Sequence, residues 1–172
     1  MTRTSGMNGG LAAAALAQAL SALPQVATSL AEAAQVTVVG LDVGGPAFGT
    51  SPGQGRVMAT VRTHDDEVME RLAGRCEHLV RGIASAHDLG CEIAWSEEFP
   101  AVVNDPAAVD RLENVAHALG LPVVEAPVPF AWSEDFGHFG SLAPSALVGL
   151  GAGMWPAVRA SRLAPIEALR YE

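Results

Sequence analysis

The first residues that could do chemistry are two adjacent carboxylates, Glu97 and Glu98. Neighbouring glutamates can act as a general base and a metal ligand, but these two precede Phe99-Pro100 at a strand end, with no His or Asp ligand nearby in the sequence. The histidines are well spread, and none forms the i, i+4 pair with an intervening Glu that is typical of a helical zinc site. Solvated carboxylates and surface or partly packed histidines are therefore the favoured interpretation. The histidines are His64, His78, His87, His117 and His138.

A second candidate is the run Ser133-Glu134-Asp135-Phe136, which follows a Pro-rich loop. Ser133 is suited to cap a short helix over 133–139, with two acids in its first turn. Arg62 is a third candidate, because a guanidinium on the polar face of a strand can hold a carboxylate with two hydrogen bonds. An exposed arginine on a strand is more often only solvated. The residue types alone leave both candidates open.

The elements that must position these residues follow from hydrophobic periodicity and turn signals. We expect a kink or a break at Pro24, with a second short helical piece ending near Ala34. The order helix, strand, strand, helix, strand predicts an α/β fold, an open-faced α/β sandwich with an antiparallel sheet and two helices. The expected ranges are helix 11–22, strand 36–43, loop 44–55, strand 56–62, a helix after Asp65 that stops at Gly90, strand 91–96, helix 106–119, strand 122–125, helix 133–139 and strand 146–150.

Composition limits the classes of partner. The chain has 172 residues and a formal net charge of −9, and its basic residues are scattered, so we expect no nucleic acid partner. Cys76 and Cys91 form no metal-binding or disulfide pattern, which fits reduced thiols in a cytoplasmic protein. The stretch 11–23 loosely imitates a secretory signal, and 142–158 is broken by prolines and glycines. We interpret both as soluble segments and expect no membrane partner.

Four blocks of sequence occur in the order that is found in one known family. The blocks are Pro46-Ala47-Phe48 through Arg62-Thr63-His64-Asp65, then Phe99-Pro100-Ala101-Val102-Val103-Asn104-Asp105-Pro106, then Trp132-Ser133-Glu134-Asp135-Phe136, and then Ala146 to Gly151. They resemble the metal-dependent amidohydrolases, metallopeptidase family twenty, which include aminoacylases, hippurate hydrolases and indole-acetyl-amino-acid hydrolases. The resemblance covers about residues 10 to 153, and several blocks in register are more specific than any one of them.

The resemblance implies a division of the chain. Residues 10–98 would form the lid and dimerisation domain, and 99–153 a partial segment of the α/β catalytic domain, after a disordered N-terminus over 1–9. Arg62 matches a lid arginine that can face the substrate's carboxylate, and Ser133, Glu134 and Asp135 would stand at the rim of the active site. A small N-acyl amino acid or carboxylate is the implied ligand, and a homodimer through the edge of the lid sheet is the implied assembly.

The resemblance also implies a departure from the family. Complete members bind a pair of divalent ions, zinc, manganese or nickel, through ligand blocks that precede the matched region and a His that would follow residues 151–153. We find no such blocks here, and no His occurs after His138. We therefore expect no metal ligands, no catalytic residues and no cofactor in this chain, which suggests a truncated amidohydrolase that is inactive alone. The alternative is a non-catalytic module that dimerises or binds small carboxylates.

The last residues follow a different pattern. Residues 156–172 resemble the cytoplasmic C-terminal tail of ABC-type permeases, without the membrane helices of such proteins. The resemblance suggests gene fusion or rearrangement. The other interpretation of the range 154–172 is an amphipathic terminal helix, with Leu163, Ile166 and Leu169 on one face.

Overall fold

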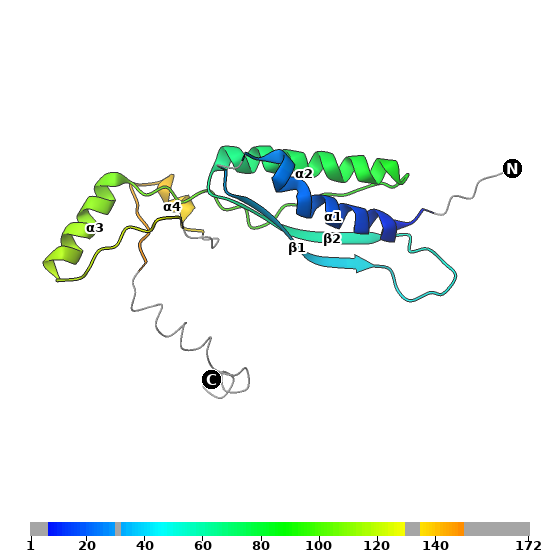
Figure 1. Cartoon of the computed structure of the whole chain (residues 1–172), viewed down its shortest axis with the longest axis horizontal. Helices are drawn as coiled ribbons and strands as arrows, with labels where there is room; N and C mark the ends of the chain where they lie inside the picture. Colours follow the sequence, from blue (N-terminus) through cyan, green and yellow to red (C-terminus); the bar gives the residue numbers. More distant parts are fainter. Residues whose placement is uncertain (1–6, 30–31, 130–134, 150–172) are drawn as a thin grey trace, which may run out of the picture. The chain divides into compact units, whose positions relative to one another are not determined.

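The computed structural model describes residues 7–29, 32–129 and 135–149. The chain divides into two units, one of residues 1–101 with 126–137 and the other of residues 102–125 with 138–172. In the first unit, helices α1 and α2 lie on one face of the antiparallel pair β1 and β2 (Figure 1). This arrangement confirms the expected α/β class. The permease-like tail and most of the expected N-terminal segment lie outside the described residues.

Helix α1 spans Gly9–Ala27, and the Asn8 side chain caps it by accepting hydrogen bonds from the backbone N–H groups of Gly10 and Leu11. The helix continues through Pro24, so the expected break at this residue is wrong. Pro24 lies in the last turn of α1, and its missing N–H removes one helical hydrogen bond. The expected helical piece up to Ala34 is also wrong, since β1 begins at that residue.

Strands β1, Ala34–Val43, and β2, Gly55–Thr63, pair antiparallel and confirm the two strands expected for these ranges. The register runs from Ala34 opposite Thr63 to Val43 opposite Gly55. It shifts between Val38 and Gly40, so Val39 is an extra residue on β1. The shift lies wholly on β1, and β2 keeps a regular alternation of its two faces.

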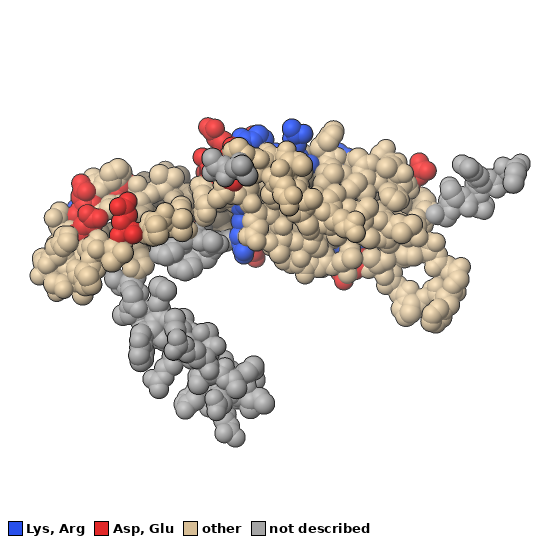
Figure 2. Space-filling model, in the orientation of Figure 1, with Lys and Arg blue, Asp and Glu red and all other residues tan. Residues whose placement is uncertain are grey.

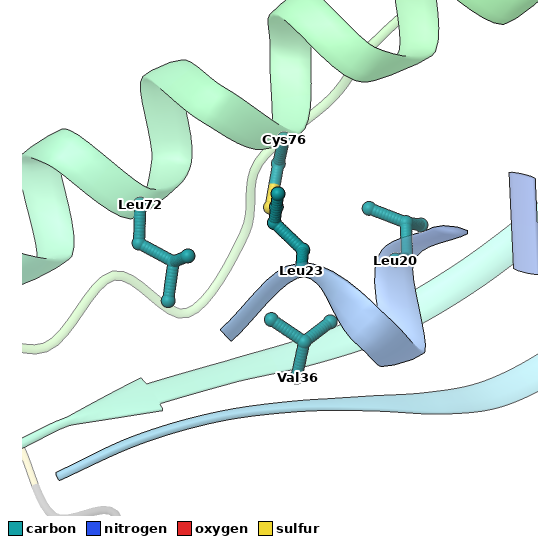
Figure 3. Close-up of a cluster of buried hydrophobic side chains, with 5 residues drawn as sticks. All are labelled: Leu20, Leu23, Val36, Leu72 and Cys76. Atoms are coloured by element: carbon teal, nitrogen blue, oxygen red, sulfur yellow. The ribbon is translucent and has the colours of Figure 1, made fainter. Parts of the chain in front are cut away.

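Helix α2, Asp66–Ala86, begins at the cap residue Asp65, whose carboxylate accepts a hydrogen bond from Val68 N at 2.9 Å. Its expected buried stripe is confirmed at Val68, Leu72 and Cys76. Leu72 is the most buried large side chain of the described residues, at 1% exposure. The core joins both helices to the sheet through Leu20, Leu23, Val36, Leu72 and Cys76 (Figure 3).

The second unit contains α3, Pro106–Ala118, which confirms the expected helix. Asn104 stands just before its cap residue and bonds to both backbone groups of Leu147, accepting from N at 2.8 Å and donating to O at 3.1 Å. The Asn104 side chain thus makes the two hydrogen bonds to Leu147 that a neighbouring strand would otherwise make. The expected strand 146–150 is therefore wrong for residues 146–149, which are not assigned to a strand.

Three other expected elements also need correction. The short helix α4 spans Gly137–Gly140, later than the expected range, whose first residues Ser133 and Glu134 lie outside the described part. Ranges 91–96 and 122–125 form no strand. A strand needs a neighbour as well as an alternating sequence, and neither range pairs with another strand in the described structure.

Among the described residues, α1 is the one helix whose length and composition would suffice to cross a membrane, with a mean hydropathy of 1.3. It overlaps the signal-like stretch that the sequence shows. In this structure Ala12, Ala13, Leu20 and Leu23 of the helix are buried. One side of α1 therefore serves as packing surface for the first unit.

We predict that Leu72→Ala lowers the free energy of unfolding by about 2–5 kcal/mol, because it leaves a cavity where α2 meets α1 and the sheet. Urea unfolding followed by circular dichroism measures the change. Gly74→Ala is the matched control in the same helix, since a Cβ at this exposed position meets nothing within 4 Å. It should stabilise the protein by roughly 0.5–1 kcal/mol. Equal stability of Leu72→Ala and the wild type would show that this core is not what holds the unit together.

Candidate functional site

Arg62 lies near the end of β2, opposite Gln35 of β1, and its side chain is exposed as expected. Its neighbour Val61 packs against the core, and since side chains of a strand alternate between two faces, Arg62 points away from the helices. Within the described residues, the Arg62 side chain makes no hydrogen bond or ion pair. Its five N–H donors are therefore available for a carboxylate from solution.

Arg56 lies on the same face of β2, six residues earlier. At about 3.3 Å per residue the two arginines are roughly 20 Å apart, so they cannot hold one carboxylate group together. Figure 2 shows that basic side chains are few on the face of the molecule that is visible there. The chemistry on this face of β2 is that of single guanidinium groups.

The loop between the strands, residues 44–54, is tied to α1 near its second end and closes a turn at its tip. Pro52 O accepts a hydrogen bond from Gly9 N at 2.8 Å, which ties the loop to the start of α1. Thr50 closes a turn by donating from N and from Oγ1 to Ala47 O, at 3.4 and 3.2 Å. At the tip, Phe48 is fully exposed and Gly49 takes a positive φ of 87°. The loop thus carries an apolar side chain into solvent, a feature that the Gly- and Pro-rich pattern did not predict.

The expected rim residues are only partly described. Asp135 is exposed in a turn that leads into α4, whereas Ser133 and Glu134 lie outside the described residues. Gly137 follows at a position where an added Cβ would clash with the carbonyl oxygen of Pro100. This close approach fixes the turn against the chain near residue 100. Asp135 makes no hydrogen bond or ion pair with Arg62, so the structure does not join the two candidates.

Glu97 and Glu98 are both exposed, as expected for solvated carboxylates. Over residues 7–29, 32–129 and 135–149, no three His, Cys, Asp or Glu side chains gather closely enough to hold a metal ion. The described residues therefore do not fit the two-metal site that the resemblance implies for complete family members. No step of a hydrolytic reaction can be assigned to them.

Two ionic clusters fix elements to α2. The first is centred on Glu77, which accepts hydrogen bonds from Trp95 Nε1 and from Arg81 Nη2, both at 3.1 Å. The Trp95 bond, followed by the Arg81 bond, lowers the pKa of Glu77. The spacing of Glu77 and Arg81 is a helical i, i+4 pair visible in sequence, but the bond to Trp95 is not local.

The second cluster joins the segment after α1 to α2. Glu32 accepts a hydrogen bond from Ser29 N at 2.8 Å and pairs with Arg71 Nη2 at 2.5 Å. The Ser29 backbone bond, followed by the Arg71 bond, lowers the pKa of Glu32. These exposed contacts orient elements and contribute little to stability.

The two cysteines occupy different environments. Cys76 belongs to the core, and burial raises the pKa of its thiol, whereas Cys91 is exposed. Both are free.

Comparison with known proteins agrees with the order of the motif blocks. The family model for peptidase family M20/M25/M40 matches residues 4–161. An uncharacterized hydrolase of Staphylococcus epidermidis is 32% identical over 108 residues, which are 62% of this chain and 28% of that protein. An uncharacterized hydrolase of Staphylococcus aureus is 28% identical over the same length, again covering 62% of this chain and 28% of the relative. The chain thus spans little more than a quarter of the length of these curated relatives.

Solved structures show the same fold. A protein from methicillin-resistant Staphylococcus aureus, described as an aminohydrolase, superposes with a TM-score of 0.66 at 23% identity, over 81% of this chain and 36% of that one. A protein from Burkholderia cenocepacia, described as an amidohydrolase/peptidase, gives a TM-score of 0.59 at 20% identity, over 84% and 34% of the two chains. At these identities the likeness shows the fold alone.

Proposed function

Because the chain belongs to peptidase family M20/M25/M40, we propose that residues 10–98 act as the substrate-contacting lid of a metal-dependent amidohydrolase. The substrates would be N-acyl amino acids, whose amide bond is cleaved. The single observation that carries this proposal is the exposed Arg62, which projects without a described partner from the face of the sheet that the helices leave open. We place this activity in the cytoplasm, in keeping with the free thiols.

In this proposal Arg62 binds and orients the substrate. The α-carboxylate of an N-acyl amino acid is planar and accepts two parallel hydrogen bonds from a guanidinium, which fixes both the position and the direction of the substrate. Ser133, Glu134 and Asp135 would contact the substrate from the rim of the active site. Fixing one end of the substrate is useful for catalysis because it presents the amide bond in a single geometry.

Hydrolysis itself would depend on metal ligands outside the described residues. In complete members of the family a pair of zinc, manganese or nickel ions activates the attacking water. The described residues do not fit such a pair, so the chain alone is proposed to bind substrates without turning them over.

A second function is favoured by the outer edge of β1. Large apolar side chains are exposed along this strand, with Val39 at 64%, Leu41 at 47% and Val43 at 37%. The strand pairs only with β2 among the described elements, so its other edge presents free backbone groups to a second copy. The alternative is therefore a dimerisation module, joined by antiparallel pairing of two β1 strands, that binds small carboxylates without catalysis.

We predict that Arg62→Gln raises the Kd of N-acetylmethionine about 10- to 100-fold, because a charge-assisted hydrogen bond is worth about 1.5–3 kcal/mol. Isothermal titration calorimetry or chemical-shift titration measures the affinity. Arg56→Gln removes the same charge from the other end of the same strand face, and it should change Kd less than about twofold. Equal losses in the two variants would mean that only general charge attraction is at work.

We also predict that the purified chain takes up less than one equivalent of metal in total after equilibration with Zn²⁺, Mn²⁺ or Ni²⁺ and dialysis. It should then release no amino acid from N-acetylmethionine. Elemental analysis and an amine-release assay provide the measurements. Two equivalents of bound metal together with turnover would contradict the proposal that catalysis needs ligands from elsewhere.

For the alternative function, we predict a dimer in analytical ultracentrifugation that Val39→Lys converts to a monomer. Val39 is the extra residue of the bulge, so this substitution adds a charge to the β1 edge with little effect on the pairing of β1 with β2. Val26→Lys is the control, because this residue is 81% exposed on α1 and should leave the dimer intact. A monomeric wild-type protein would remove the basis for the alternative.

A further inference from the structure

The face of the sheet that the helices leave open differs in charge between its two ends (Figure 1). The antiparallel register places Arg56 opposite Asp42 at one end and Arg62 opposite Gln35 at the other. Residues directly opposite each other have Cβ atoms about 4.5–5.5 Å apart, so Asp42 offsets the charge of Arg56. The charge of Arg62 meets only a neutral amide. An anion in solution is therefore attracted to the Arg62 end of the open face.

Gln35 is the polar residue that faces Arg62 across the sheet. Its neighbours Ala34 and Val36 pack in the core, so the alternation of β1 places Gln35 on the open face. Its side chain is exposed and makes no hydrogen bond within the described residues. A carboxylate that accepts two hydrogen bonds from a guanidinium keeps further lone pairs, and the amide of Gln35 has two N–H donors to offer them.

The residues next along the open face are uncharged. Thr37 and Thr60 stand opposite each other, and their hydroxyl groups make no hydrogen bond within the described part of the chain. Met58 follows opposite Gly40, where an added Cβ would clash with the Met58 methyl group, so the thioether lies across the bulge of β1. We call Thr37, Thr60 and Met58 the neutral strip. A ligand that extends from Arg62 over this strip meets two hydroxyl groups and then an apolar surface.

We propose that Gln35 is a second ligand of the substrate's carboxylate, and that the neutral strip restricts the substrates to N-acyl amino acids with an uncharged side chain. This inference deepens the proposed function and rests on it, because it assumes that Arg62 holds the carboxylate. The hydroxyl groups suit the amide of such a substrate, and Met58 suits an apolar side chain. An acidic side chain would bring a second carboxylate over the strip, where β1 and β2 supply no cation to replace the water that it loses.

Substitutions of Gln35 test its role as a ligand. We expect Gln35→Glu to raise the Kd of N-acetylmethionine about tenfold, because the new carboxylate stands opposite Arg62 and competes for the guanidinium. Gln35→Met keeps the length of the side chain but removes both donors, and it should raise Kd about three- to tenfold. Gln54→Glu is the matched control, since it adds the same charge just before the far end of β2 and should change Kd less than about twofold.

A gain of affinity tests the neutral strip. The wild-type chain should bind N-acetylmethionine at least about threefold more tightly than N-acetylglutamate in calorimetric titrations. Thr60→Lys places an ammonium group two residues from Arg62, roughly 6.6 Å along β2, within reach of the glutamate side chain. This variant should bind N-acetylglutamate about three- to fivefold more tightly than the wild type does, with less than a twofold change for N-acetylmethionine. A purely structural role of Thr60 would produce no such gain.

The outcomes distinguish this inference from the proposed function. If Arg62→Gln weakens the binding of N-acetylmethionine and neither Gln35 variant does, the proposed function stands and Gln35 is not a ligand. A wild-type preference for N-acetylglutamate, or no gain in Thr60→Lys, would overturn the restriction to uncharged side chains. Absence of N-acetylmethionine binding by the wild-type chain would overturn both proposals. Circular dichroism spectra that match the wild type show that each variant is folded.

Discussion

The packing of α2 on α1 and on the sheet is the interaction on which the first unit depends. A two-stranded sheet is marginal by itself in water, because it has too little surface to bury. Leu72 and Cys76 of α2 meet Leu20 and Leu23 of α1 over Val36 of β1, and this small cluster supplies the missing burial (Figure 3). At about 1.5–3 kcal/mol for each fully buried large side chain, each contact in so small a cluster matters. The helices can cover only one face of the strands, so the other face and both outer edges stay available for function.

The open face carries the candidate binding group. Arg62 is exposed there because its neighbour Val61 takes the buried position, and the alternation of a strand then places the guanidinium in solvent. In the proposed function, this guanidinium holds the carboxylate of the substrate. Among the described residues, no three His, Cys, Asp or Glu side chains gather to hold a metal ion. Binding and catalysis are thus separated in this proposal, with the first assigned to the lid and the second to ligands elsewhere.

The two edges of the sheet differ in character. The outer edge of β1 is apolar and contains the bulged Val39, which fits a second copy of the same surface. The other edge of β2 has no partner strand among the described elements, and residues 90–98 are held to α2 by the bond from Trp95 to Glu77. The difference arises from the order of the elements, because the chain that follows α2 returns beside β2 and not beside β1.

The sequence by itself determined the elements whose stabilising contacts are local or periodic. The acids and apolar stripe after Asp65 predicted α2, strict alternation around Val57 and Val61 predicted β2, and the order of the motif blocks predicted the family. It also placed Arg62 on an exposed strand face, because two-residue periodicity is sufficient for that.

Only the tertiary structure decided which segments pair as strands. Residues 91–96 and 146–149 alternate or are apolar like strands, yet the first range has no neighbouring strand and the second bonds to the Asn104 side chain. Pro24 stays helical and lies in the last turn of α1, which continues to Ala27. A side-chain pattern records which face of a segment is apolar, whereas a strand also requires a second backbone at hydrogen-bonding distance. That second backbone is set by contacts distant in sequence.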